Sequence, residues 1–60
     1  MTEVLWDYPE VSQYTGIPVA TLRWWRANGL GPKSARLGRR VKFRKSDVEA
    51  WISAAFEGNA

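Results

Sequence analysis

A glycine and a proline two residues apart divide the first half of the chain into two helices. Asp7-Tyr8-Pro9-Glu10 has the form of a capping box, which starts a helix. Gly16 can take the left-handed conformation that ends this helix, and Pro18 has the fixed φ that suits the start of another. Gly29 then ends the second helix after Asn28. The pattern predicts helices at about residues 8–15 and 18–28, joined by a tight turn, which is the outline of a helix-turn-helix.

A chain of 60 residues without cysteine needs an efficient apolar core. Aromatic rings each bury about 150–250 Å², and we predict that Trp6, Trp25 and Trp51 serve this core. The chain has no histidine either, so zinc fingers, disulfides and catalysis by cysteine or histidine are excluded. We therefore expect a non-enzymatic protein with no catalytic residue, metal ligand, cofactor or small-molecule ligand.

A β-hairpin is predicted at about residues 33–44, after the break at Gly31-Pro32. Apolar and polar residues alternate along both arms, as in half-buried strands. If Leu37 lies opposite Val41, the apolar faces of the two arms coincide, and the loop has three residues, Gly38-Arg39-Arg40. The other face would then carry Arg36, Lys42 and Arg44.

A third helix is predicted at about residues 46–57, because Ser46-Asp47-Val48-Glu49 has the form of a second capping box. Its apolar residues follow the spacing of an amphipathic helix: Val48, Trp51, Ile52, Ala55 and Phe56. The expected fold is mainly α with a two-stranded wing, a winged helix-turn-helix in which residues 1–60 form a single domain.

The charges are strongly segregated along the chain. All nine basic residues lie between Arg23 and Lys45, and no acidic residue occurs between Glu10 and Asp47. A purely cationic segment suits a polyanion, and nucleic acid is the commonest such partner. The alternative is a solvated basic face, although ordinary surfaces intersperse both signs.

The second helix and the hairpin therefore supply the candidate DNA contacts. In the helix, the surface away from the core would approach base edges and phosphates through Val19, Ala20, Thr21, Arg23, Trp24 and Arg26. The wing candidates are Arg36, Gly38, Arg39, Arg40 and Lys42, because arginines at a hairpin tip can follow phosphates or enter a narrow minor groove. Flanking phosphate candidates are Lys33, Arg44 and Lys45.

Each of these assignments has a structural alternative. Arg23 and Arg26 are also explained as solvated helix residues, and arginines on a hairpin edge also prevent strand-to-strand aggregation. The alternative for Lys45 is that it serves only the approach to the third helix. For Trp24 three roles remain open, namely stacking on sugar-phosphate, packing as core under the wing, and contact with a protein partner.

Four segments together resemble the MerR-type winged helix, and most of all its excisionase-like branch, which includes the small phage excisionases found in mycobacteriophages. These segments are Thr21-Leu22-Arg23-Trp24-Trp25, Asn28-Gly29-Leu30-Gly31-Pro32, Arg36-Leu37-Gly38-Arg39-Arg40-Val41 and Ser46-Asp47-Val48-Glu49-Ala50-Trp51. The resemblance covers about residues 6–56.

The resemblance implies a recombination directionality factor that binds double-stranded DNA at a phage attachment site, bends it, and directs an integrase, tyrosine-type or other, towards excision. It places the recognition helix at residues 19–24 and the wing tip at residues 38–40, and it allows self-association along the DNA. Many relatives have polar or basic residues where this chain has Pro18-Val19-Ala20, so we expect few base-specific hydrogen bonds.

Two other functions fit the same residues. A small phage transcriptional regulator would use the same domain, and a protein-interaction module would bind an acidic partner through the basic face, with Trp24 as a hot spot. The chain has no apolar run of about 18 residues and no signal-peptide layout, so we expect no membrane association and a cytoplasmic location in an infected or lysogenic bacterial host.

Overall fold

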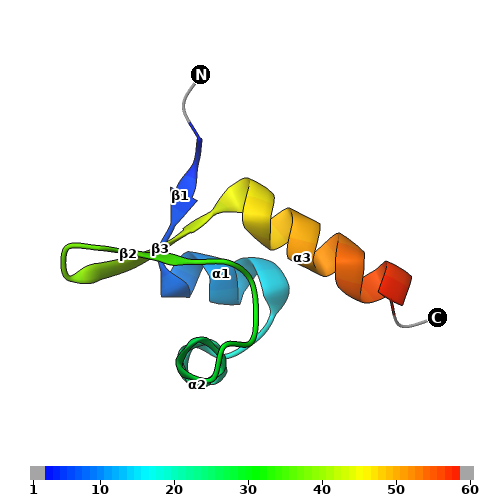
Figure 1. Cartoon of the computed structure of the whole chain (residues 1–60), viewed down its shortest axis with the longest axis horizontal. Helices are drawn as coiled ribbons and strands as arrows, with labels where there is room; N and C mark the ends of the chain where they lie inside the picture. The colour runs from blue at the N-terminus through cyan, green and yellow to red at the C-terminus, as the bar shows by residue number, and fades with distance from the viewer. Residues whose placement is uncertain (1–2, 59–60) are drawn as a thin grey trace.

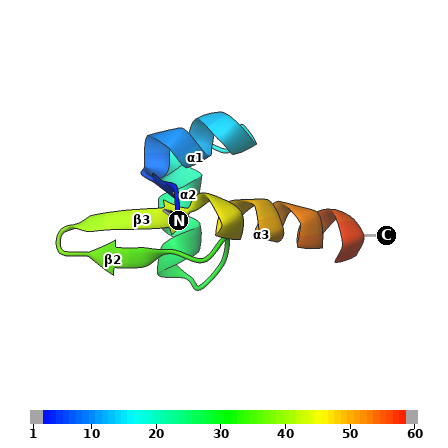
Figure 2. The same cartoon turned by 90° about the horizontal axis from the view of Figure 1, so that it is seen from above.

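The computed structural model of the chain describes residues 3–58 and contains three helices and a small sheet (Figure 1). In chain order the elements are β1 (Leu5–Trp6), α1 (Tyr8–Thr15), α2 (Val19–Ala27), β2 (Ala35–Leu37), β3 (Arg40–Arg44) and α3 (Lys45–Gly58). The β2–β3 hairpin and the far end of α3 extend in opposite directions (Figures 1 and 2). The predicted winged helix-turn-helix is confirmed, and its sheet has a third strand. The single-domain prediction for residues 1–60 extends to positions 1–2 and 59–60, which lie outside the described residues.

Helix α1 begins and ends as its local sequence predicts. The amide of Asp7 donates to Glu10 Oε1 at 2.8 Å, the interaction expected of a capping box. At the other end, Gly16 has a φ of 77°, and its amide donates to the carbonyl of Ser12 at 2.8 Å. A left-handed residue at this position is inexpensive only for glycine, so Gly16 fixes where α1 stops.

Helix α2 is one residue shorter at each end than predicted. Pro18 has extended backbone angles, φ −58° and ψ 146°, so it is the N-cap and not the first helical residue. After Ala27, the amide of Gly29 donates to Arg26 O at 3.2 Å and that of Leu30 donates to Trp25 O at 2.7 Å. These two bonds are those of a Schellman motif, which satisfies the last carbonyls of the helix.

The predicted register of the hairpin is wrong. Leu37 lies opposite Arg40 and Arg36 lies opposite Val41, so the loop has two residues, Gly38 and Arg39. Arg36 therefore shares a face with Val41, and Lys42 and Arg44 lie on the other face.

The turn and the exposure of β2 explain this register. Gly38 has a φ of 65° and Arg39 does not have a positive φ, as in a two-residue turn with glycine at its first central position, which matches the twist of paired strands. All three residues of β2 are exposed, Leu37 to 52%. Since β2 has no buried face, turning Leu37 to the side of Phe43 would gain little, and the turn decides the register.

Strand β1 was not predicted from the sequence. It pairs antiparallel with β3, with Trp6 opposite Phe43 and Leu5 opposite Arg44, so the sheet order is β1-β3-β2. The amide of Lys45 also donates to the carbonyl of Val4 at 2.9 Å. The start of the described chain is thus fastened to the junction of β3 and α3.

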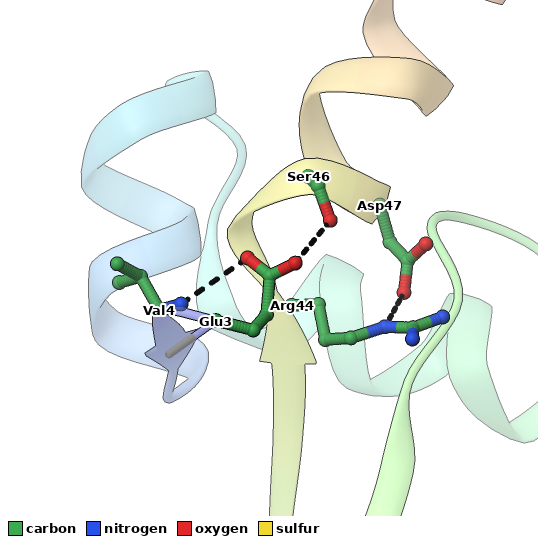
Figure 3. Close-up of polar contacts among 5 residues, drawn as sticks. All are labelled: Glu3, Val4, Arg44, Ser46 and Asp47. Carbon is green, nitrogen blue, oxygen red and sulfur yellow. Dashed lines mark hydrogen bonds and ion pairs between the residues drawn. The ribbon is translucent and has the colours of Figure 1, made fainter. Parts of the chain in front are cut away.

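The predicted capping box at Ser46 does not form. Helix α3 begins at Lys45, directly after β3, and the Ser46 hydroxyl donates to Glu3 Oε1 at 2.7 Å (Figure 3). Asp47 accepts a hydrogen bond of 2.6 Å from Arg44 Nε. The Ser46 hydroxyl, which the capping box would use, is thus engaged with a residue that precedes the helix.

The core lies where α1, α2, β3 and α3 meet. Its fully buried side chains are Val11, Leu22, Phe43 and Val48. Around them pack half-buried aromatics, among them Trp6, Tyr8 and Trp25, and the Trp25 and Trp51 ring centroids are 5.8 Å apart. The tryptophans predicted as core therefore form its rim.

Only the first part of α3 buries the apolar residues of its amphipathic pattern. Val48 is buried and Trp51 and Ile52 are half-buried, whereas Ala55 is exposed and Phe56 is exposed to 82%. The helix continues beyond the body of the molecule (Figure 2), and its residues 53–58 are all exposed. Among residues 3–58, none of the helices combines the length and the apolar character that crossing a bilayer requires.

Candidate nucleic-acid interface

An open cleft of about 350 Å³ separates the start of α2 from the tip of the hairpin. It is lined by Asp7, Tyr8 and Pro9 around the start of α1, by Val19 and Arg23 from α2, and by Arg39, Arg40 and Val41 from the hairpin, so it holds one carboxylate among its cations. The cleft thus brings together cationic side chains that are far apart in the sequence.

One wall of the cleft holds Arg23 in place. The Arg23 guanidinium carbon lies 5.4 Å from the centre of the Tyr8 ring, which is a cation–π contact. The Tyr8 ring in turn meets Phe43 edge-on, with ring centroids 5.4 Å apart. Arg23 therefore rests on a ring that the core itself supports, and it keeps its charge exposed at the cleft.

The tip of the hairpin carries arginines without partners. Arg36, Arg39 and Arg40 are all exposed, and within residues 3–58 none of them makes an ion pair or a side-chain hydrogen bond. We call these three residues the tip arginines. Their charges are available to a ligand because no protein carboxylate pairs with them.

Lys42 and Arg44, on the same strand, are paired instead. Lys42 Nζ lies 2.6 Å from Asp7 Oδ1, and this hydrogen bond holds the pKa of the Asp7 carboxyl below its ordinary value of 3.8. Arg44 binds Asp47, and that hydrogen bond raises the pKa of the Arg44 guanidinium (Figure 3). Each carboxylate partly cancels the positive charge beside it, so these two side chains have less to offer a phosphate than the tip arginines.

Three more candidates on α2 face the protein as well as solvent. Arg26 Nε donates to Ser34 Oγ at 3.0 Å, which turns Arg26 towards the segment after α2. Thr21 is half-buried, and Val19 is half-buried against the cleft. The exposed residues of α2 are Ala20, Arg23, Trp24, Arg26 and Ala27.

Trp24 is not a core residue. Its exposed fraction is 60%, which removes packing under the wing from the three roles that the sequence left open. Trp24 lies one helical turn from Ala20, so the two side chains share a face.

The flanking candidates lie away from the cleft. Lys33 and Arg44 border a second, open groove of about 430 Å³ on the other face of the sheet, beside Leu5, Ala35 and Leu37. Lys45 is half-buried at the start of α3. The structure therefore groups Arg23, Arg39 and Arg40, and it separates them from Lys33, Arg44 and Lys45.

Sequence reasoning missed the roles of Tyr8 and Asp7. Tyr8 supports an arginine 15 positions later in the chain, and Asp7 neutralises Lys42 of the hairpin. No spacing rule connects such distant positions. The only available signal was that Asp7 and Tyr8 lie at the start of a helix that precedes the purely cationic segment of the chain.

A helix-turn-helix whose second helix shares a basic cleft with a β wing defines a winged DNA-binding domain. Residues 8–55 match the family model described as a helix-turn-helix domain. The chain belongs to this helix-turn-helix domain family, a DNA-binding domain found in excisionase-like proteins and typically non-enzymatic. Comparisons with curated proteins and with solved structures gave no match.

Proposed function

We propose that this protein is an excisionase, a DNA-binding and DNA-bending accessory factor that promotes integrase-mediated excision at phage attachment sites. The observation that carries the proposal is the cleft between α2 and the hairpin tip, with Arg23 on one side and Arg39 and Arg40 on the other. A DNA backbone lying in this cleft would be held from both sides.

The two walls suit the two grooves of a duplex. A helix fits the major groove, which is about 12 Å wide, and arginines are attracted to a narrow minor groove by its negative potential. With α2 in the major groove, the tip arginines reach the neighbouring minor groove across one backbone. The start of α2 has no side-chain cap, so its first amides face an incoming phosphate with the positive end of the helix dipole.

This grip explains how a small protein bends DNA. Bending costs elastic energy, which extra contacts on the bent duplex offset. Contacts in adjacent grooves stabilise a duplex that curves towards the protein, and neighbouring copies along the DNA would share the cost. We place this activity in the cytoplasm of a phage-infected or lysogenic bacterium, with an integrase as the second protein partner.

Each candidate residue has a role in this proposal. The recognition helix contributes Val19, Ala20, Thr21, Arg23, Trp24 and Arg26, the wing contributes Arg36, Gly38, Arg39, Arg40 and Lys42, and the flanking phosphate contacts are Lys33, Arg44 and Lys45. Arg23 and the tip arginines supply most of the affinity, because within residues 3–58 none of them forms an ion pair, although Arg40 lies near enough to Asp7 to help lower the pKa of its carboxyl. Lys42 and Arg44 contribute less.

The deciding experiment is an excision assay with the integrase and attachment sites of the genome that encodes the chain. We expect excision to rise when the purified protein is added, and the rise to disappear when both Arg39 and Arg40 are replaced by alanine. Phe56→Ala, which removes an exposed ring from the opposite end of the molecule, is the control. DNA binding without stimulated excision would contradict the excisionase function and favour a transcriptional regulator built on the same domain.

A salt titration tests DNA binding itself. About five phosphate contacts predict a slope of about −4 to −5 in a plot of the logarithm of the binding constant against the logarithm of salt concentration. A flat plot would contradict DNA binding and favour a protein-interaction module.

A further inference from the structure

We propose that α2 selects its DNA site through apolar contact between the Trp24 indole and the 5-methyl group of thymine. This inference rests on the proposed DNA-binding function and specifies what the helix reads. It follows from what α2 exposes and from what its polar side chains already bind.

One face of α2 is exposed and apolar. Trp24 lies near the middle of the helix with 60% of its surface exposed, and its face also carries Ala20 and Ala27, both exposed. The two small residues leave the indole as the largest projecting group. When α2 enters a groove, the Trp24 ring therefore approaches the base edges.

The polar side chains of α2 are directed elsewhere. Arg26 donates to Ser34 at 3.0 Å, and Arg23 rests on the Tyr8 ring at the cleft wall, where the backbone is expected to lie. Asn28, just after the helix, donates from Nδ2 to the carbonyl of Trp24 at 2.7 Å. Arg26 Nε and Asn28 Nδ2 are thus engaged within the protein and Arg23 is held at the cleft wall, which leaves the indole as the group that projects from the Trp24 face.

Thymine is the base that such a surface can distinguish. In the major groove every base pair offers hydrogen-bonding atoms, but only thymine adds an exposed methyl group, and apolar side chains contact it. Burying one methyl group between the indole and the groove is expected to change affinity about fourfold, from the usual value for a buried carbon. A helix that reads one or two methyl groups would have a modest preference for sequence.

The surroundings favour DNA over a protein as the occupant of this face. No acidic residue lies between Glu10 and Asp47, so the sequence around Trp24 is cationic throughout. A sugar-phosphate would also accept stacking by the indole, but stacking on the backbone does not depend on a methyl group in the groove. The two contacts are therefore separable by chemistry.

The experiment replaces thymine by uracil, which differs only by this methyl group. Tight-binding duplexes are selected from a random library, and the best is resynthesised with deoxyuridine at one thymidine at a time. We expect about a fourfold loss of affinity at one or two positions for the wild-type protein. In Trp24→Ala the ratio of thymine to uracil affinity should fall to about one at those positions, and in the control Phe56→Ala it should stay at the wild-type value.

The outcomes separate this inference from the DNA-binding function. Tight, salt-dependent binding with a ratio of one at every position would overturn methyl recognition and leave DNA binding intact. A ratio that persists in Trp24→Ala would overturn the role of the indole. An absence of salt-dependent binding to any duplex would overturn both. Circular dichroism of Trp24→Ala should match the wild-type spectrum, since the side chain is largely exposed.

Discussion

The hairpin tip and helix α2 form the two sides of one cleft, yet their side chains are arranged in opposite ways. The tip arginines are exposed and unpaired within residues 3–58, whereas Arg23 and Arg26 of α2 rest against Tyr8 and Ser34. The helix exposes an indole beside its two arginines. The two elements therefore have different roles in binding: the hairpin supplies long-range electrostatic attraction, and the helix supplies a rigid surface.

The core explains this division. Leu22 anchors α2 and is only 2% exposed, so the side chains of the helix are presented from a fixed backbone. Strand β2 buries nothing, so the hairpin tip is held only by its turn and its pairing with β3. A less constrained element can adapt to the backbone of a bent duplex, while a fixed helix can compare base edges.

The largest effect is expected from Phe43→Ala, which should remove both regions at once. Phe43 is 2% exposed and packs at the centre of the core, where loss of a phenylalanine side chain costs about 3–5 kcal/mol. A small domain has little more stability than this, so the variant should be largely unfolded by circular dichroism. Phe56→Ala removes the same side chain at an exposed site and should stay within about 0.5 kcal/mol of wild type in urea unfolding. A folded Phe43→Ala variant would show that the two regions are supported independently.

The second effect, on affinity, comes from replacing both Arg39 and Arg40 by alanine. Two lost phosphate contacts should reduce the steepness of the salt plot by about 2 and weaken binding on the order of tenfold, equally for all sequences. Fluorescence anisotropy at several salt concentrations measures both quantities. Arg44→Ala is the matched control on the same strand, and it should change the slope less because Asp47 already shares its charge. Equal effects of the two changes would contradict the distinction between paired and unpaired arginines.

A smaller effect is expected from Arg23→Ala, which lowers the charge on the α2 side of the cleft. The salt plot should become less steep by about 1, as for one lost phosphate contact. Arg23→Lys should restore the slope, because it keeps the charge and gives up only the planar contact with Tyr8. If neither variant alters the slope, Arg23 does not contact the backbone.

The smallest effect concerns the pair that joins the hairpin to α1. Because the hydrogen bond from Lys42 lowers the pKa of Asp7, its stabilising contribution is present above the ordinary value of 3.8 and is lost as pH falls through the lowered pKa. Lys42→Met should raise the pKa of Asp7 towards its ordinary value and weaken the pH dependence of stability in acid. Carboxyl NMR titration measures the pKa. If the pKa of the Asp7 carboxyl is the same in Lys42→Met as in the wild-type protein, the pairing of Asp7 with Lys42 is contradicted.

Local signals made the helices of the amino-terminal half predictable from the sequence. Asp7 and Glu10 start α1, and the glycines at positions 16 and 29 end α1 and α2 through bonds within a few residues. These capping interactions depend only on neighbours in the chain, so the sequence pattern locates the helix ends to within a residue. The basic cleft was also foreseeable in outline, since all nine cationic residues fall on α2, the hairpin and the segments beside them.

Elements that depend on distant partners were not predictable in the same way. Strand β1 is two residues long and exists through its pairing with β3. At the start of α3, the Ser46 hydroxyl donates to Glu3, which is 43 positions earlier in the chain. The hairpin register failed for a different reason. The prediction assumed that Leu37 would be buried on the same face as Val41. Leu37 is exposed, so placing its side chain on the other face of the hairpin carries no penalty.

Helix α3 continues past the core that supports it. Its two parts should therefore differ in how well their amides are protected against hydrogen exchange. Its amides up to Ile52 lie on turns that pack against β3 and Trp25, so they should exchange with solvent deuterium only when the whole molecule opens. The turns around Phe56 have no tertiary contact and should exchange by fraying, because isolated helical turns are marginal in water. The last turns of α3 are thus an end that can be ordered by whatever binds it, without disturbing the cleft at the other side of the molecule.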